Sequence, residues 1–407
     1  MTVAAMALAA PAGVFAAAMH FAGALKSVPG LAALPFDLTL ASVLLLAPCL
    51  ALLVAGREWH VSPVLAVPLL GCGGLWLWLV IAGTWSASAT VLASKLPELV
   101  VMGPAMLAAG MIVAGDPATL DRFARAVVLV GIVVAASTAW GLATGGVVLG
   151  GRAGASPEQI RVQYQIAGLS IASAAGVLAV MAMEARGLRR ALCLGLLAAL
   201  AAAALLPGGR AALLALALAV TVAPVVLLWR SGRPVAALGW PAALILCAGL
   251  GLALLQSDPS LATGLRTLER LTGGGDLGEA SARLPLWRAA LAWAGEAAPF
   301  GLGTGGFTIA AGFGERRGLY PHNHALEAVA EGGLPGLVFW LLAFGGGAVA
   351  AIAAGARAEP GRAARIAALT LPMALTVMVS TDLGNRMAWF ALGLALGLGL
   401  TARPRHV

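Results

Sequence analysis

The chain has 407 residues, of which 61% are hydrophobic and only 10% are charged, and its mean hydropathy is +0.96. Charged residues make up about 25% of an average soluble domain, so this composition excludes a soluble fold. The formal net charge of +8 does not indicate binding to nucleic acid, because the basic residues are dispersed singly or in short groups rather than collected in one stripe.

Long apolar runs recur along the chain and predict transmembrane helices, since about 20 apolar residues cross the hydrocarbon of a bilayer. Strands of a β-barrel would instead alternate apolar and polar residues over roughly ten positions. The runs cover residues 3–25, 37–55, 63–83, 97–114, 123–144, 165–183, 191–206, 211–229, 235–256, 334–354, 366–381 and 387–402. We therefore predict an all-α polytopic integral membrane protein with about twelve transmembrane helices. The first run has no basic residue before it, so we interpret it as a span and not as a signal peptide.

Basic residues are divided unevenly between the two sets of connections. With the N-terminus inside, the cytoplasmic turns hold Arg57, Arg122, Arg125, Arg186, Arg189, Arg190, Arg230, Arg233, Arg357, Arg362, Arg365, Arg403 and Arg405. The short outer connections hold only Lys26, Lys95, Arg152, Arg161, Arg210 and Arg386. This asymmetry follows the positive-inside rule and predicts that both termini are cytoplasmic.

One connection is much longer than the others and divides the chain into three parts. Residues 1–256 hold nine predicted spans, residues 257–333 form a periplasmic loop, and residues 334–407 hold three spans and a cytoplasmic tail. A loop of this length is typically functional. Its segment 281–298 has Leu284, Trp287, Leu291 and Ala294 at helical spacing, which predicts a short amphipathic helix at the membrane surface.

The first candidate binding residue is Arg210, which follows Pro207-Gly208-Gly209 at the outer start of a predicted span. The free N–H groups of a helix N-terminus favour anions, and an arginine adds a forked contact for phosphate oxygens. Taken alone, Arg210 also fits a boundary arginine that extends toward the membrane surface.

The long loop contains Arg283 and Arg288, followed by the glycine-rich run from Gly301 to Phe307. Gly301, Gly303 and Gly306 have the spacing of a dinucleotide-binding motif. We reject that interpretation, because no strand precedes the run and no βαβ unit surrounds it. A tight turn at the membrane surface is the simpler interpretation, and Arg288 alone would fit a solvated loop charge.

The third segment has the most specific pattern and reads Tyr320-Pro321-His322-Asn323-His324-Ala325-Leu326-Glu327, with Glu331-Gly332-Gly333 following before a span. A metal site would use both histidines and both glutamates. HNHxxE is not a zinc-protease pattern, however, and histidines two residues apart point to different faces of a helix. A neutral imidazole at the water interface suits general-base chemistry near neutral pH. We therefore predict no metal and no cofactor.

Three motifs together resemble the shared region of O-antigen ligases and polymerases: GGR-AALLAL at 208–216, R…W-R…P-x-G-x-G-x-x-x-F at 283–307, and H-N-x-x-L-E…E-G-G-L-P-G-L at 322–337. In that family a small residue, often Ser, precedes the first arginine, and here it is Gly209. The resemblance covers about residues 200–345 and does not separate ligase from polymerase.

The resemblance implies a GT-C-like, metal-independent, inverting glycosyltransferase of the bacterial inner membrane with its active site on the periplasmic face. Its expected donor is a glycan on undecaprenyl diphosphate and its expected acceptor is lipid A-core oligosaccharide, within the lipid bilayer. His322 would be the general base, and Arg210 and Arg288 would bind the diphosphate. The candidate supporting residues are Asn323, Glu331, Arg283, Arg161 and Tyr320.

Ligation to lipid A-core is our first expectation, followed by polymerisation and then by protein O-glycosylation. A membrane transporter is the alternative from a different class. Many transporters have two related halves and ionisable residues at mid-membrane. The sequence shows no clear duplication, and its predicted spans are nearly free of charge at their centres.

Overall fold

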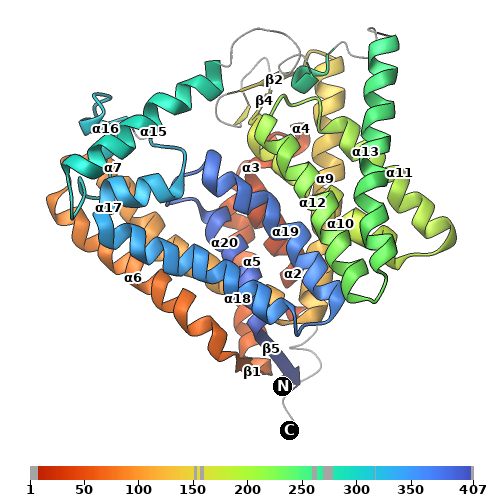
Figure 1. Cartoon of the computed structure of the whole chain (residues 1–407), viewed down its shortest axis with the longest axis horizontal. Coiled ribbons are helices and arrows are strands. Elements are labelled where there is room, and N and C mark those ends of the chain that lie inside the picture. The colour runs from red at the N-terminus through yellow and green to blue at the C-terminus, as the bar shows by residue number, and fades with distance from the viewer. Residues whose placement is uncertain are drawn as a thin grey trace.

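The chain folds almost entirely into helices, as Figure 1 shows for the computed structural model of the protein. The structure describes residues 8–150, 154–155, 160–258, 264–268, 278–316 and 318–404. Within these ranges, nine helical stretches are long and apolar enough to cross a membrane: Leu38–Gly56, Pro63–Trp85, Ala89–Gly115, Pro117–Ala143, Tyr164–Glu184, Arg210–Arg230, Pro234–Ser257, His324–Gly355 and Pro360–Val379. The predicted all-α membrane fold is therefore confirmed.

Some of these stretches are single helices and others are joined from shorter pieces. The single helices are α5 (Leu38–Gly56), α9 (Pro117–Ala143), α10 (Tyr164–Glu184), α12 (Arg210–Arg230), α13 (Pro234–Ser257) and α19 (Pro360–Val379). The joined ones are α6 (Ala66–Ala82) with its flanking 3-10 turns, α7 (Ala89–Pro97) with α8 (Gly103–Gly115), and α17 (His324–Trp340) with α18 (Gly346–Gly355). A π-helical turn connects the two helices of each of the last two pairs.

The other three predicted runs form shorter helices. The run 191–206 lies in α11 (Gly187–Ala203), and the run 387–402 lies in α20 (Arg386–Leu396) and the turn after it. The described part of the run 3–25 is interrupted at Phe21, between α2 (Ala12–His20) and α3 (Ala22–Leu25). A short helix, α4 (Pro29–Ala32), follows before α5.

The predicted span 334–354 begins ten residues earlier than expected, at His324. The side chain of Asn323 caps this helix, because its Oδ1 accepts a hydrogen bond from the Leu326 backbone N–H at 3.1 Å. Gly333 has a φ of +64°, which kinks α17 without ending it. Part of the predicted periplasmic loop is therefore helix.

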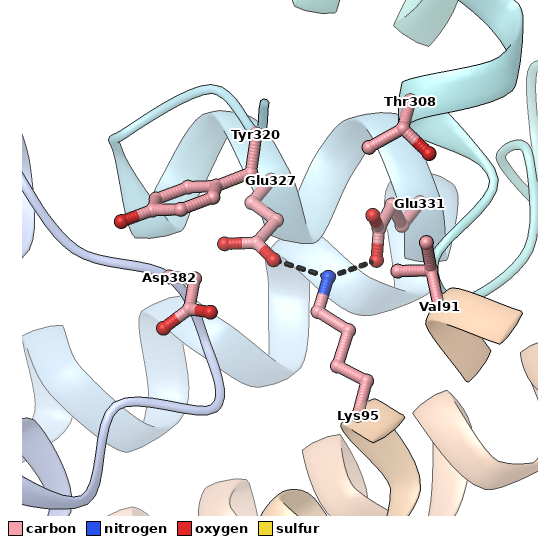
Figure 2. A pocket seen from close by; sticks show the side chains of 7 residues that line it. All are labelled: Val91, Lys95, Thr308, Tyr320, Glu327, Glu331 and Asp382. Carbon is pink, nitrogen blue, oxygen red and sulfur yellow. Dashed lines mark hydrogen bonds and ion pairs between the residues drawn. The ribbon is translucent and has the colours of Figure 1, made fainter. Parts of the chain in front are cut away.

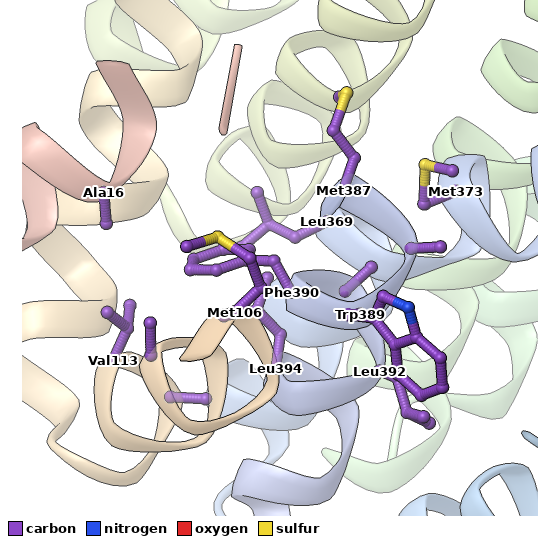
Figure 3. Close-up of a cluster of buried hydrophobic side chains, with 14 of the residues drawn as sticks. Ala16, Met106, Val113, Leu369, Met373, Met387, Trp389, Phe390, Leu392 and Leu394 are labelled. Carbon is purple, nitrogen blue, oxygen red and sulfur yellow. The ribbon is translucent and has the colours of Figure 1, made fainter. Parts of the chain in front are cut away.

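Small residues bring the central helices close together. α10 is the most enclosed of the nine candidate spans, with 83% of its most apolar window buried, and it packs against α9, α11, α12 and α19. At Gly168 an added Cβ would lie only 2.4 Å from the Cβ of Ala212 in α12. Such contacts between small side chains are the usual basis of helix packing in lipid. Figure 3 shows part of the largest buried cluster, where side chains of α8, α19 and α20 meet. The most apolar window of α13, by contrast, has no buried residue, so its apolar side chains are suited to contact lipid.

One end of the bundle gathers the connections that we predict to be cytoplasmic. There β1 (Arg57–Val61) pairs antiparallel with β5 (Leu400–Pro404), as Figure 1 shows. Arginines tie the helix ends together at this end. Arg362 donates to the carbonyls of Ala114, Gly397 and Leu400 at 2.6–2.9 Å, as expected for a cation at helix C-termini.

The opposite end carries the remaining secondary structure. A small sheet has the order β2-β4-β3, with β2 (Val147–Leu149) parallel to β4 (Ile160–Val162) and β3 (Gly154–Ala155) antiparallel to it. The helices α15 (Gly278–Glu296) and α16 (Phe307–Ala310) are on this side of α17.

The helix predicted at 281–298 is present as α15, and apolar residues lie on more than one of its faces. Leu286 and Ala290 are buried against Phe307 and Ala330, whereas Leu284 and Leu291 are exposed. The buried face packs on α17, so it is offset from the face that spacing alone predicts.

Candidate functional site

His322 lies in the turn just before α17. Its φ is +56°, a left-handed conformation that few non-glycine residues adopt. The helix begins at His324 because Asn323 is its N-cap. Asn323 also donates from Nδ2 to the Met378 carbonyl at 2.9 Å, which joins this turn to the end of α19.

The imidazole of His322 is half-buried against aromatic and charged groups. The ring centroids of His322 and Tyr320 are 4.1 Å apart. Burial and the nearby Arg283 charge lower the pKa of His322, and the Ser380 carbonyl and the Asp382 carboxylate oppose that effect. The ring is therefore neutral at neutral pH, and its buried Nδ1 has no hydrogen-bond partner among the described residues.

His324 occupies a different environment, although only one residue separates it from His322. Its side chain is 0% exposed, its Nε2 lies 2.9 Å from the Thr381 hydroxyl, and its ring meets Phe344 edge-on. His324 therefore has a buried polar partner in the fold. The partner is Thr381, at the end of α19.

Of the two candidate arginines in the long loop, Arg283 is the one beside His322. Its Nη2 donates to the Ser380 hydroxyl at 3.4 Å, and Ser380 in turn donates to Gln165 Oε1 at 2.9 Å. Arg288 is exposed on α15, where its spacing from Leu284 and Leu291 corresponds to one outward face of the helix. The structure thus brings Arg283 to the histidine and leaves Arg288 on the outer surface.

Arg210 is the first residue of α12, as predicted, and it follows two buried glycines. The Gly208 N–H donates to the Thr267 hydroxyl at 3.1 Å, and a Cβ at Gly209 would lie 3.5 Å from the Tyr164 ring. The Tyr164 hydroxyl accepts a hydrogen bond from the neighbouring Gln165 at 3.4 Å. The start of α10 therefore links the start of α12 to Ser380.

Arg161, the last of the candidate arginines, is exposed in β4 at the same end of the molecule. Its carbonyl accepts a hydrogen bond from Ser27 at 3.4 Å. This contact fixes the backbone of the strand. No described contact brings the Arg161 guanidinium to His322.

The glycine-rich run packs closely against other segments of the chain, which agrees with our rejection of a dinucleotide-binding motif. Gly303 has a φ of +84°, and an added Cβ would lie 2.8 Å from the Ser86 backbone. Its N–H donates to the Glu331 carbonyl at 2.9 Å, and Thr304 donates to the Leu79 carbonyl at 2.6 Å. The run therefore lies tightly between α6 and α17.

Sequence reasoning missed Lys95, which we had placed in an outer connection. It lies in α7 with 4% exposure, and its ammonium donates to Glu331 at 2.6 Å and pairs with Glu327. Figure 2 shows Lys95 between the two carboxylates, with Asp382 and Tyr320 beside Glu327. The cavity that these side chains line with Val91 and Thr308 has a volume of about 10 Å³, room for roughly one water molecule. The sequence carries no local signal for this cluster, because Glu327 and Glu331 lie in the predicted periplasmic loop, more than two hundred positions after Lys95.

Groups that could hold a metal ion are absent from the part of the chain that the structure describes, since no three or more His, Cys, Asp or Glu side chains are suitably arranged there. The arrangement instead offers a neutral imidazole, nearby guanidinium groups and hydroxyls. Such a set can remove a proton from a hydroxyl and stabilise an anionic leaving group.

A comparison with protein families adds a finding that covers most of these residues. Residues 194–341 match the family model described as O-Antigen ligase. No curated protein matches the chain. The matched segment includes Arg210, both loop arginines, His322 and Glu331.

Proposed function

We propose that this membrane protein, a member of the O-antigen ligase family through its residues 194–341, transfers O-antigen polysaccharide from undecaprenyl diphosphate to lipid A-core oligosaccharide. The observation that carries the proposal is the half-buried His322 imidazole, which lies beside Arg283 and has an unpartnered Nδ1. His322 lies in the turn before α17, at the end of the bundle that carries α15 and α16.

In the proposed reaction, a hydroxyl oxygen of the acceptor attacks the anomeric carbon of the donor. The bond from that carbon to the diphosphate oxygen breaks, and the hydroxyl proton passes to His322. If the Nε2–H is directed at the Ser380 carbonyl, the lone pair of Nδ1 is left to accept this proton. An in-line attack inverts the configuration at the anomeric carbon.

The leaving diphosphate gains negative charge in the transition state, and arginines would stabilise it. Arg210 supplies a guanidinium at a helix N-terminus, where anions are favoured. Arg283 supplies the one closest to His322, and the exposed Arg288 suits a first contact with the lipid-linked donor. Metal ions have no role in this scheme. We expect transfer to continue in a strong chelator, and loss of activity that a divalent ion restores would contradict this.

We place the site on the periplasmic face of the bacterial inner membrane, with both termini in the cytoplasm. The sorting of the arginines supports this orientation, because the end that holds β1 and β5 also holds Arg57, Arg230 and Arg362. The buried ionisable cluster lies beside the opposite end, near α15 and α16, rather than midway along a duplicated fold. That position favours an enzyme over a transporter.

The test is transfer by the purified protein from a lipid-linked O-antigen donor to lipid A-core. We expect the wild-type protein to produce substituted core and the His322→Ala protein to produce very little. In cells, deletion of a ligase leaves free lipid-linked polymer and unsubstituted core, whereas deletion of a polymerase leaves core with single repeat units. The second pattern would overturn the ligase assignment in favour of polymerisation.

A further inference from the structure

Lys95 joins two turns of the helix that follows His322. Glu327 and Glu331 are four residues apart on α17, so they share one face of the helix. The Lys95 ammonium from α7 contacts both carboxylates, and all three residues are at most 4% exposed. We name Lys95, Glu327 and Glu331 the ion triad.

The carboxylates of the ion triad also hold two backbone segments. Glu331 Oε2 accepts a hydrogen bond from the Gly305 N–H at 2.8 Å, within the glycine-rich run. Glu327 Oε2 accepts one from the Leu383 N–H at 2.9 Å, within the turn that follows α19. The ion triad therefore connects α7, α17, the glycine-rich run and the turn around Leu383.

That turn also carries the groups that surround His322. Ser380 interacts with the imidazole through its carbonyl, and Asp382 lies beside Tyr320 in Figure 2. His322 itself has a left-handed backbone, which persists only where the surrounding structure holds it. Its position depends on α17 on one side and on the turn around Leu383 on the other.

We propose that Lys95 is a positioning residue for His322, because its ion pairs lock α17 and the turn around Leu383 into one arrangement around the imidazole. The inference rests on the proposed function, since it gives Lys95 a part in the same transfer reaction. Lys95 itself touches neither substrate nor the reacting atoms.

Removal of the cation has a foreseeable effect on this arrangement. In Lys95→Met an unbranched apolar side chain remains, but the two buried carboxylates lose the positive charge that offsets their mutual repulsion. The carboxylates then move apart or take up water, and the backbone segments that they hold move with them. A displacement of about 1 Å at a reacting group costs about 10²-fold in rate.

The first measurement is kcat and KM for transfer from the lipid-linked donor. We expect Lys95→Met to lower kcat about 10²-fold and to leave KM for the donor nearly unchanged. The matched control is Arg365→Met, which removes an ion pair with Glu184 at the opposite end of the bundle. This control should keep the wild-type rate. An undiminished kcat in a folded Lys95→Met protein would overturn the inference.

The second measurement follows the position of His322 without any turnover. Diethyl pyrocarbonate modifies accessible neutral imidazoles, and mass spectrometry gives the rate at each histidine. We expect His322 to react several-fold faster in Lys95→Met, while the exposed His60 on β1 serves as an internal reference. An unchanged His322 rate would contradict the positioning role even if transfer were slow.

A neutral variant separates positioning from simple charge balance. Lys95→Met/Glu327→Gln/Glu331→Gln removes all three charges, so it folds without an uncompensated buried carboxylate even if Lys95→Met alone does not. We expect this protein to remain slow and its His322 to remain reactive, because the Lys95 bridge is still absent. Recovery of the wild-type rate would show that only charge balance matters and would overturn the inference. Absence of transfer by the wild-type protein would instead refute the proposed function, and the modification rates would still test Lys95.

Discussion

The phenol ring of Tyr320 lies against the imidazole of His322, with planes inclined by 44°. The Tyr320 hydroxyl donates to the Ser380 carbonyl at 3.4 Å. Burial and the neighbouring Asp382 carboxylate raise the pKa of Tyr320 well above its ordinary value of 10. The phenol therefore stays protonated at neutral pH and acts only as a donor or an apolar surface. Of the two rings, His322 is the one suited to accept a proton.

Replacement of the two histidines should separate catalysis from stability. We expect His322→Ala to lose about 10²- to 10⁴-fold in transfer rate, the usual effect of removing a general acid or base. His324→Ala should keep most of its activity per folded molecule but unfold at lower temperature, because it leaves a cavity and removes the hydrogen bond between the imidazole and the Thr381 hydroxyl. Initial rates and thermal unfolding in detergent would measure both effects. Equal, large rate losses at both positions would instead favour a shared binding role.

The pH dependence of transfer should report the charge beside His322. Because burial and Arg283 lower the pKa of His322 from its ordinary value of 6.5, its basic form persists below that pH. We therefore expect the acidic limb of kcat/KM to lie below pH 6.5. In Arg283→Met the positive charge that opposes protonation is gone, so the pKa rises and the limb moves to higher pH. Arg288→Met, on the outward face of α15, should leave the limb in place.

Lysine substitutions should rank the three arginines by their distance from the reacting bond. An ammonium cannot reproduce the forked contact with a diphosphate. We expect Arg210→Lys and Arg283→Lys to lower kcat by about 10²- to 10³-fold, as for loss of one contact that strengthens in the transition state. Arg288→Lys should mainly raise KM for the donor, because this side chain is exposed. A near-normal rate for Arg210→Lys would make it a boundary anchor.

Cysteine labelling should establish the orientation in the membrane. Gly274, in the middle of the long connection, lies outside the described residues, so exposed Arg316 is the better probe. In a cysteine-free protein in cells with a permeable outer membrane, Arg316→Cys should react with an impermeant maleimide. Glu58→Cys on β1 should react only after the inner membrane is opened. The reverse result would refute the proposed topology.

Hydropathy was sufficient to predict the helices, because membrane spans are defined by length and composition. The predicted run 37–55 and the observed Leu38–Gly56 differ by one residue at each end. The start of α17 was missed because it depends on one side-chain cap, at Asn323, and on a glycine that kinks the helix without ending it. Spacing along the chain carries little information about such local backbone geometry.

The candidate site was only partly predictable for a similar reason. The motif around His322 is local in sequence, and its residues do lie together. Lys95 belongs to the same cluster through contacts with residues more than two hundred positions away, and no periodicity connects them. Which of Arg283 and Arg288 lies beside His322 likewise depends on which face of α15 packs inward. The inward face packs against Phe307 and Ala330, which are distant from both arginines in the sequence.

The pairing of β1 with β5 has a consequence for how the protein is made. Arg57 aligns with Pro404 and Val61 with Leu400. β1 is therefore synthesised early but can pair only after β5 has been synthesised. The preceding helix, α20, fills the interior with Trp389 and Phe390, and a Cβ at Gly110 of α8 would lie 2.2 Å from the Phe390 carbonyl. Until the ribosome releases this segment, the face of α8 that contains Gly110 lacks the helix that packs against it. A chain that stops before α20 therefore lacks the helix that packs against α8. Membrane proteases could recognise such a chain by its unpacked α8.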